Sequence, residues 1–286
     1  MQKYFGELIL VVVTLLAAIG WFFSKYAIEE MPPIDFIGLR FLAASLLFLP
    51  FAYPKLKKIP PHLAYSAAGV GLIFTLNLAF WVSAITYSNE FGAGAFVISL
   101  SMLIAPLLAW LFFKQKPNTT FWFSFPIALS GLYFLSATSH STSFSLGTIF
   151  FLCSAFTAAF YFVLNNKYAK QIAPLPLTTI QLGIVGILCS TYSLMMENWP
   201  DSISATTLAW FSASVVIATS LRFFLQTLGQ KHCHITSAAI IMTLEPVWTL
   251  CLSVWILNEV LTWQKALGCS LILTALFVYR LKFLKK

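Results

Sequence analysis

The segment TSAAIIMTLEPVWTLCLSVWILNE, Thr236–Glu259, is the part of the chain that decides how the rest is interpreted. It is apolar and long enough to cross the hydrocarbon core of a bilayer, which takes about 20 helical residues. Glu245 and Pro246 lie near its middle. A carboxylate at that depth costs at least about 2.5–3.5 kcal/mol on insertion scales, and a proline removes a backbone donor. If the chain is a membrane protein, Glu245 therefore needs a specific role.

The composition places the whole chain in a membrane. Of its 286 residues 59% are hydrophobic and 9% are charged, whereas about 25% of the residues in a soluble domain are charged. Apolar runs of membrane-spanning length recur ten times, which predicts an all-α integral membrane protein with ten transmembrane helices. The expected spans are residues 6–28, 34–53, 63–86, 91–113, 119–137, 145–167, 176–196, 206–228, 235–257 and 262–281.

The first span resembles a signal peptide but continues to Lys25 and has no Ala-x-Ala cleavage site, so we expect it to be retained. The connections are at most about ten residues long by the expected boundaries, which leaves no room for a soluble domain. All function must then lie within the helix bundle.

The charges on the connections predict the orientation. One face carries Lys3, Lys55, Lys57, Lys58, Lys114, Lys116, Lys167, Lys170, Lys231, Arg280, Lys282, Lys285 and Lys286. The other carries Glu29, Glu30, Asp35, Glu90, Glu197, Asp201 and Glu259, with Lys25 and Lys265. By the positive-inside rule the basic face is cytoplasmic, which puts both termini inside at the inner (plasma) membrane. The net charge of +8 is thus a topology signal and predicts no binding of nucleic acid.

Metal binding is not expected. The run His232-Cys233-His234 matches no zinc spacing, and the sequence offers no evident fourth ligand. The cysteines within the spans are interpreted as small apolar residues.

A repeat relates the two halves of the chain. Lys25-Tyr26-Ala27 precedes Pro32 by the same spacing as Lys167-Tyr168-Ala169 precedes Pro174, at an offset of 142 residues. The same offset aligns Gly92–Leu103 with His234–Glu245. The predicted repeats are residues 1–140 and 145–286, each with five spans. An odd number of spans inverts the second copy in the membrane, and inverted repeats are typical of secondary transporters with a site at the repeat interface.

The sequence resembles the ten-helix, EamA-type branch of the drug/metabolite transporter superfamily over nearly its whole length. The residues that carry the resemblance are Trp21-Phe22-Phe23-Ser24-Lys25, Pro33 with Arg40-Phe41-Leu42-Ala43-Ala44, and Pro246 with Glu259 and Gly268. Gly20 precedes Trp21, whereas in the family a glycine follows the tryptophan. The first half departs from the family pattern, because Lys114-Gln115-Lys116 follows Pro106 where an acidic residue is usual. The resemblance implies gradient-driven export of small metabolites, commonly amino acids or amphipathic compounds.

Polar and aromatic residues at helical spacing are candidates for a substrate pathway. Ser154, Thr157, Tyr161 and Asn165 share one helix face, and so do Ser212, Thr219, Arg222 and Gln226. Trp21 pairs with Lys25 and Asn77 with Trp81 at a spacing of four. Lys25 could instead extend to the headgroups, and Arg40 could pair with Asp35 or with an interior carbonyl. The candidate pathway residues are Trp21, Lys25, Arg40, Asn77, Trp81, Tyr161, Asn165, Arg222, Glu245 and Trp248.

Pro106 and Pro246 are expected to break their helices. Broken helices at membrane depth are tolerated where protein or a water-filled cavity satisfies the backbone, so Glu245 should face the bundle interior. Two roles remain open for it: a structural acceptor paired with a neighbour, or a residue that binds a solute ammonium group or a coupling proton.

The leading prediction is a secondary transporter that exports small metabolites, with a small-molecule solute, a coupling proton or ion, and the lipid bilayer as its partners. An importer or antiporter of vitamins, nucleotide-linked sugars or lipid head groups on the same fold is the first alternative. An intramembrane enzyme is disfavoured because the sequence has no His-Glu-x-x-His or Gly-x-Ser-x-Gly motif and no histidine within a span. A scaffold without transport is disfavoured by the repeat. No cofactor is expected, and a phosphate-binding loop is lacking. The sequence leaves the oligomeric state open.

Overall fold

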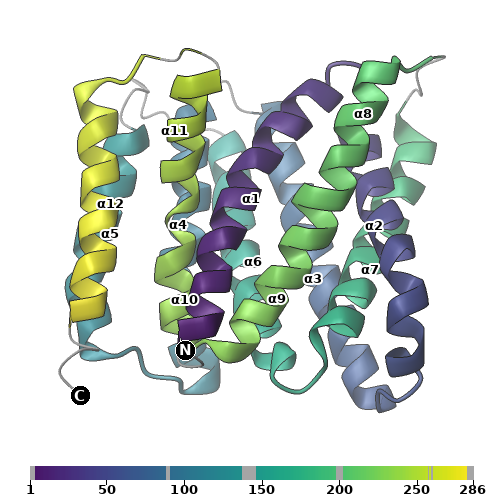
Figure 1. The fold of residues 1–286 in the computed structure, drawn as a ribbon, viewed down its shortest axis with the longest axis horizontal. Coiled ribbons are helices and arrows are strands. Elements are labelled where there is room, and N and C mark those ends of the chain that lie inside the picture. Colours follow the sequence, from purple (N-terminus) through teal and green to yellow (C-terminus); the bar gives the residue numbers. More distant parts are fainter. Residues whose placement is uncertain are drawn as a thin grey trace. The chain divides into compact units, whose positions relative to one another are not determined.

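The computed structural model describes residues 4–87, 91–136, 146–197, 202–256, 258 and 260–281, and the regular structure among them is entirely helical (Figure 1). The elements are α1 (Phe5–Ala27), α2 (Pro33–Leu56), α3 (Pro61–Tyr87), α4 (Phe91–Phe113), α5 (Thr119–Ser136), α6 (Leu146–Ala169), α7 (Pro174–Met196), α8 (Ala205–Ala213), η2 (Ser214–Leu221), α9 (Arg222–His232), α10 (Ile235–Met242), α11 (Glu245–Ile256) and α12 (Trp263–Leu281).

The helices fall on the expected apolar segments. Seven segments of the described chain are long and apolar enough to cross a membrane: Phe5–Ala27, Pro33–Leu56, Pro61–Ala84, Leu146–Ala169, Pro174–Met196, Ala205–His232 and Ile235–Ile256. Shorter apolar helices cover Ile98–Phe113, Thr119–Leu135 and Trp263–Tyr279. The chain is therefore a multi-pass membrane protein, and the count of ten spans stays a prediction.

The chain forms two compact units. Unit 1 comprises Met1–Leu76 and Leu164–His232, and unit 2 comprises Asn77–Val163 and Cys233–Lys286. Each unit takes helices from both predicted halves, so the units do not coincide with residues 1–140 and 145–286. The halves were predicted as structural repeats, and their relation by a two-fold axis stays a prediction.

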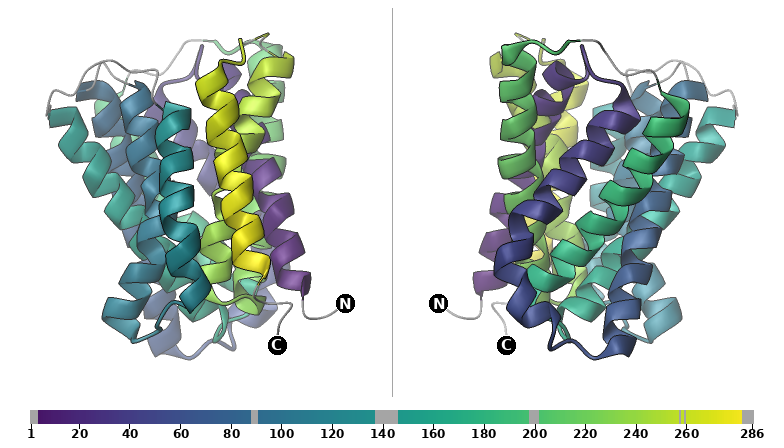
Figure 2. Two further views of the ribbon diagram at one scale, coloured as in Figure 1. Left: turned by 90° about the vertical axis from the view of Figure 1, so that its left-hand side faces the viewer. Right: turned by 90° about the vertical axis from the view of Figure 1, so that its right-hand side faces the viewer.

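In unit 1, α2 packs along α7 through small residues (Figure 2, right). A Cβ atom added to Gly186 would lie 2.4 Å from the backbone nitrogen of Leu42, and one added to Gly38 would lie 2.6 Å from that of Ser190. Such contacts allow no larger side chain. The absence of side chains at these points lets the two backbones approach closely, as small residues do between membrane helices.

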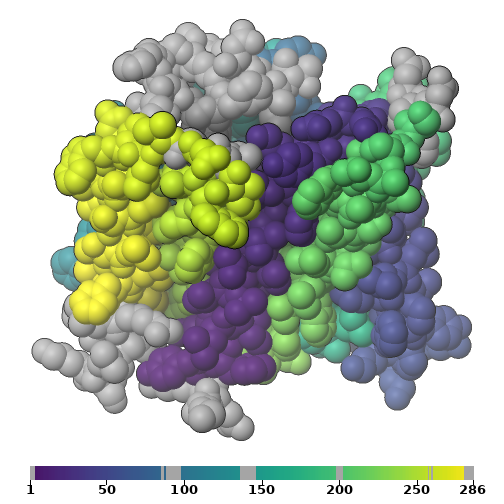
Figure 3. Space-filling view, turned by 45° about the horizontal axis from the view of Figure 1, so that its top comes forward, coloured from purple at the N-terminus to yellow at the C-terminus, as the bar shows by residue number. Residues whose placement is uncertain are grey.

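Helix α1 of unit 1 packs against α8, η2 and α9, and its contact with α8 is visible in Figure 3. The closest point is Gly20, where an added Cβ would lie 2.7 Å from the Cβ of Ala218 in η2. Gly20 therefore sets how closely α1 can approach η2.

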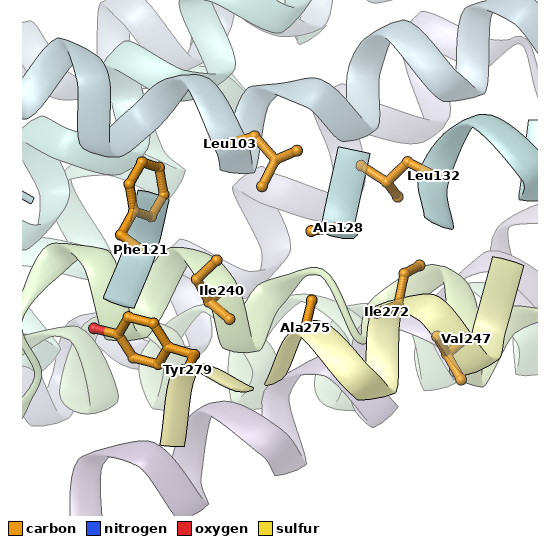
Figure 4. Close-up of a cluster of buried hydrophobic side chains, with 9 residues drawn as sticks. All are labelled: Leu103, Phe121, Ala128, Leu132, Ile240, Val247, Ile272, Ala275 and Tyr279. Carbon is orange, nitrogen blue, oxygen red and sulfur yellow. The ribbon is translucent and has the colours of Figure 1, made fainter. Parts of the chain in front are cut away.

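In unit 2, α5 packs along α12 (Figure 2, left), again through a pair of glycines, Gly131 and Gly268. The buried side chains around this pair come from α4, α5, α10, α11 and α12, and Figure 4 shows them: Leu103, Phe121, Ala128, Leu132, Ile240, Val247, Ile272, Ala275 and Tyr279. The Tyr279 hydroxyl adds a polar link at one end of the cluster, since it accepts from Asn118 Nδ2 at 3.2 Å and lies 3.0 Å from Ser237 Oγ.

Candidate functional site

Arg40 lies in α2 of unit 1 and is held by two other elements. Its Nη1 donates to Ser24 Oγ of α1 at 2.9 Å and to Ser214 Oγ of η2 at 3.1 Å. The guanidinium carbon lies 5.1 Å from the ring centre of Phe36 and 5.2 Å from that of Phe41. Pairing of Arg40 with Asp35 is not found. Among the described residues its hydrogen-bond acceptors are neutral hydroxyls.

Arg222 begins α9, directly after η2, and is partly buried. Its guanidinium carbon lies 4.9 Å from the ring centre of Phe223. The Phe223 ring centre lies 5.5 Å from that of Phe41, which contacts Arg40. The structure thus brings together two candidates that the sequence separates by 182 positions, from 40 to 222.

The predicted polar stripe of the eighth segment is wrong in register. Thr219 and Gln226 are buried and Arg222 is partly buried, but Ser212 is exposed and donates only to the carbonyl of Leu208. The reason is η2, in which residues 214–221 wind as a π-helix. Its wider turn breaks the 3.6-residue spacing on which the stripe was predicted.

Asn165 lies in a buried polar network of α6, α7 and α9. Its Nδ2 donates to Gln230 Oε1 and to Thr227 Oγ1, the latter at 3.3 Å, and its Oδ1 accepts from Gln181 Nε2 at 2.9 Å. Thr178 Oγ1 donates to Thr227 Oγ1 at 3.1 Å. Because the amide of Asn165 is paired on both sides, the network gives Asn165 a structural role that joins three helices.

In unit 2, Glu245 begins α11 directly after an interruption of the ninth segment. Helix α10 ends at Met242, Thr243 and Leu244 form a turn, and α11 starts at Glu245. The proline at 246 cannot donate to the Met242 carbonyl, which explains a break at this point. The prediction of a broken helix at Pro246 is confirmed. Glu245 is partly buried.

Pro106 behaves differently. Helix α4 continues from Phe91 to Phe113 through this proline, so the expectation that Pro106 breaks its helix is wrong. Pro106 is buried, and packing of α4 against α5 and α10 keeps the helix continuous around it.

Trp248 follows Glu245 by three positions, a spacing that puts the two side chains on one face of α11. Its indole Nε1 is buried and has no hydrogen-bond partner among the described residues. An indole donor that is buried usually finds an acceptor, so Trp248 departs from the usual pattern.

The other candidates of unit 2 are mostly internal. Asn77 Nδ2 donates to the backbone oxygen of Ser154 at 2.8 Å and to its Oγ at 3.0 Å, which joins α3 to α6. Tyr161 is buried and Trp81 is partly buried. In unit 1, by contrast, Trp21 is 50% exposed and Lys25 is exposed, so this pair projects away from the packed interior.

Two glutamates accept backbone hydrogen bonds near the starts of α2 and α8, and neither contact was predicted. Glu197 accepts hydrogen bonds from the backbone nitrogens of Ile34 and Asp35, at 3.2 and 2.8 Å, and so satisfies the first turn of α2. Glu30 accepts from the backbone nitrogen of Ser204 at 2.8 Å. No local sequence pattern indicates a partner more than 160 positions away.

The remaining predicted residues include His234, which has a structural role, and several charged residues of the connections. Among the described residues no group of three His, Cys, Asp or Glu side chains could hold a metal. His234 Nδ1 accepts from the Thr236 nitrogen and caps α10. Lys3, Glu90, Asp201, Glu259, Lys282, Lys285 and Lys286 lie outside the described residues.

One family model matches the chain twice, at residues 4–137 and 145–281, and its description is the EamA-like transporter family. The chain belongs to this family. The EamA-like transporters are part of the drug/metabolite transporter superfamily, so the resemblance noted from the sequence is confirmed.

Similar proteins are also transporters by name. An uncharacterized transporter of Archaeoglobus fulgidus is 27% identical over 98% of this chain and 87% of its own length. The uncharacterized inner membrane transporter YicL of Salmonella typhimurium is 25% identical over 93% of each chain. A crystal structure with 16% identity superposes with a TM-score of 0.80 over 97% of this chain and 98% of its own, a likeness of fold.

Proposed function

We propose that this EamA-like protein is a secondary transporter that exports amino acids or related amphipathic compounds across the inner membrane by alternating access. Membership of the family supports transport, and the name of the Salmonella relative supports the inner membrane. The two matched ranges, which lie close to residues 1–140 and 145–286, support two repeats of one ancestral unit. Inverted repeats exchange two pseudo-equivalent arrangements, which is the basis of alternating access.

The observation that carries the proposal is the interruption at Thr243–Leu244. An interrupted helix in an apolar segment leaves backbone groups that only protein or a hydrated cavity can satisfy. A carboxylate at Glu245 and the buried Nε1 of Trp248 lie within one turn of this break. Transporters place their binding groups at such broken helices, because the helix ends supply additional polar contacts.

We propose that Glu245 faces the bundle interior and binds the ammonium group of the solute or a coupling proton. A carboxylate can accept several hydrogen bonds when charged and donate one when protonated. Both states are useful in a transport cycle, whereas a structural acceptor needs only one of them. The other pathway candidates of unit 2, Asn77, Trp81 and Tyr161, would contribute hydrogen bonds and ring contacts.

A flux experiment tests this function. The purified protein is reconstituted in vesicles, and uptake and release of a labelled amino-acid panel are measured in both orientations and with an imposed proton gradient. Export predicts net movement from the cytoplasmic face. Movement only in the opposite direction would favour an importer. Absence of flux for every solute, with and without the proton gradient, would overturn the proposal.

Glu245→Gln separates the two roles of the carboxylate. Gln keeps the shape and some hydrogen bonding but carries no charge, so we expect flux per folded protein to fall at least about tenfold while folding is retained. Glu29→Gln, a neutralisation in an exposed turn, is the matched control. Unchanged flux in Glu245→Gln across a range of pH would leave a structural role, in which case Glu245→Leu should reduce the amount of folded protein.

The proposal includes cytoplasmic termini. In a cysteine-free background, a probe that cannot cross the membrane should label a cysteine at position 201 and not one at position 57 in intact cells. The reverse pattern would invert the orientation and, with it, the assigned direction of transport.

A further inference from the structure

We infer that Arg40 and Arg222 form a binding site for the carboxylate of an amphipathic organic acid, a site that lies in unit 1 and is separate from Glu245. The inference rests on the proposed function in one respect: it takes the bound acid to be the transported solute. It commits to a solute class: a small molecule with one carboxylate beside an apolar or aromatic body.

The first observation is the incomplete pairing of Arg40. A guanidinium has five N–H donors, and the hydrogen bonds of Arg40 among the described residues all leave from Nη1 to the hydroxyls of Ser24 and Ser214. Its Nε is buried and has no hydrogen-bond acceptor. No carboxylate among the described residues pairs with Arg40. A buried cation normally has an anionic partner, so Arg40 keeps a donor and a charge that a ligand can satisfy.

The second observation is the neighbouring positive charge. Arg40 and Arg222 belong to one ring cluster, because Phe41 beside Arg40 and Phe223 beside Arg222 have ring centres 5.5 Å apart. Both arginines lie in apolar segments where a charge is costly. Two like charges in one apolar cluster repel each other. An anion bound between or beside them would relieve the repulsion and complete the donor set of Arg40 at the same time.

The third observation is the aromatic surroundings. Phe36 and Phe41 face the Arg40 guanidinium, and Phe223 faces that of Arg222. The rings of Phe41, Phe74 and Phe223 contact one another, with centres 5.2–5.5 Å apart. Cation–ring contacts orient the guanidinium groups, and the buried rings of Phe41, Phe74 and Phe223 make their surroundings apolar. A ligand with a carboxylate matches the guanidinium groups, and its apolar body matches the aromatic rings.

A carboxylate fits better than a phosphate. The planar guanidinium fork pairs with two carboxylate oxygens in parallel, which gives Arg its advantage over Lys at such sites. A phosphate would bring two charges and no apolar body to a site that is largely aromatic. The geometry therefore favours a monocarboxylate.

Binding of a matched pair of probes tests the inference directly. The wild-type protein in nanodiscs of neutral phosphatidylcholine is titrated with benzoate, with benzamide and with inorganic phosphate, and the apparent melting temperature is followed. Benzamide keeps the ring and the shape of benzoate but lacks the charge. We expect benzoate to stabilise the protein in a saturable way and benzamide to need at least about tenfold higher concentration. Equal stabilisation by both, or stabilisation by phosphate alone, would overturn the inference.

Variants then assign the site. Arg40→Gln should weaken benzoate binding at least about tenfold, because it removes the charge and the fork together. Arg40→Lys, which keeps the charge without the fork, should weaken it by less. Lys58→Gln removes one charge from the exposed turn that follows α2 and should leave the affinity unchanged. Wild-type affinity in a folded Arg40→Lys and in a folded Arg222→Gln would assign both arginines to packing alone.

The readout is independent of transport. If benzoate binds as expected and no flux is found, the site stands and the transport proposal fails. If neutral or cationic solutes are exported while benzoate and benzamide bind equally, the transporter stands and the carboxylate site fails.

Discussion

Two of the apolar segments are interrupted, and they are interrupted for different reasons. The Ile235–Ile256 segment of unit 2 breaks at a turn, directly before Pro246. The Ala205–His232 segment of unit 1 stays helical but winds as a π-helix through η2, whose residues SVVIATSL include neither proline nor glycine. The local sequence indicates the first interruption through Pro246, whereas no residue of η2 indicates the second.

The difference lies in where the constraint originates. At Pro246 the missing N–H leaves the Met242 carbonyl without its helical partner, a cause that lies in the local sequence. At η2 the distinguishing features are contacts with other helices: Gly20 of α1 lies against Ala218, and Arg40 of α2 donates to Ser214. Wide turns of this kind occur often at functional sites. Here η2 carries Ser214 at its start and is followed at once by Arg222, so the interruption presents both to Arg40.

The contact at Gly20 gives the largest expected effect on stability. Gly20→Ala would put a Cβ 2.7 Å from the Cβ of Ala218, an atom that cannot rotate away, so α1 or η2 must shift. We expect the free energy of unfolding to fall by about 2–3 kcal/mol. Gly69→Ala in α3 is the matched control, because an added Cβ there meets no atom within 4 Å. Apparent melting temperatures of the two variants in detergent measure the contrast. Equal melting temperatures would show that the α1–η2 contact does not constrain η2.

Ser214→Ala should have the next largest effect. It removes one of the two hydroxyl acceptors of Arg40, and hydrogen bonds to charged groups contribute roughly 1.5–3 kcal/mol, part of which Ser24 would retain. We expect a loss of about 1–2 kcal/mol in the free energy of unfolding. Ser212→Ala, two positions earlier, loses only a bond to its own helix and should change stability by less than about 0.5 kcal/mol. A loss of the same size in both variants would contradict an anchoring role for Ser214.

The sequence predicted the structural features that are set by residues close together along the chain. Apolar runs located the helices, and the missing N–H of Pro246 located the break between α10 and α11. Pro106 has the same chemistry yet lies in a continuous α4, which shows that packing decides whether a proline interrupts a helix. The sequence therefore predicted the segments better than their internal geometry.

The partners of the candidate residues could not be predicted, because they are set by long-range packing. Arg40 finds its acceptors 16 and 174 positions away, and Asn165 pairs with Gln230 at a separation of 65. The spacing argument failed at Ser212 because it assumed an α-helix through η2. On the uninterrupted α6, Ser154, Tyr161 and Asn165 are buried and Thr157 is partly buried, and their role in a pathway stays a prediction.

Pro246→Ala tests whether the proline causes the break between α10 and α11 of unit 2. With an N–H restored at position 246, the Met242 carbonyl can be paired and one helix can run from α10 into α11. Stability should change by less than about 1 kcal/mol, because Pro246 now occupies a helix start, where proline is tolerated. Hydrogen exchange across residues 243–248 should slow, and flux should fall if the break is used in transport. Pro33→Ala, at the start of α2 and after a connection, is the control. Unchanged exchange would mean that packing, and not Pro246, maintains the break.

The smallest effect on stability is expected at Glu30, in the connection between α1 and α2. Glu30 links this connection to the start of α8. Its Oε2 accepts from the backbone nitrogen of Ser204, the residue that caps α8. The hydrogen bond from the Ser204 backbone, followed by that from its side chain, lowers the pKa of Glu30 below its usual value. A negative charge at a helix N-terminus is favourable as well.

The lowered pKa fixes the sign of the pH dependence. The unfolded chain binds a proton to Glu30 at a higher pH than the folded protein does, so the folded state is favoured while Glu30 is charged. This stabilisation is complete above the pKa of the group in the unfolded chain, about 4.5, and is lost as the pH falls through the lower, folded pKa. Glu30→Gln should therefore melt at a lower temperature than the wild type at pH 7, and the difference should shrink below pH 4. Glu29→Gln removes the same charge from the same turn without the Ser204 bond, and a pH-dependent difference of equal size in that variant would show that general charge, and not the cap of α8, is responsible.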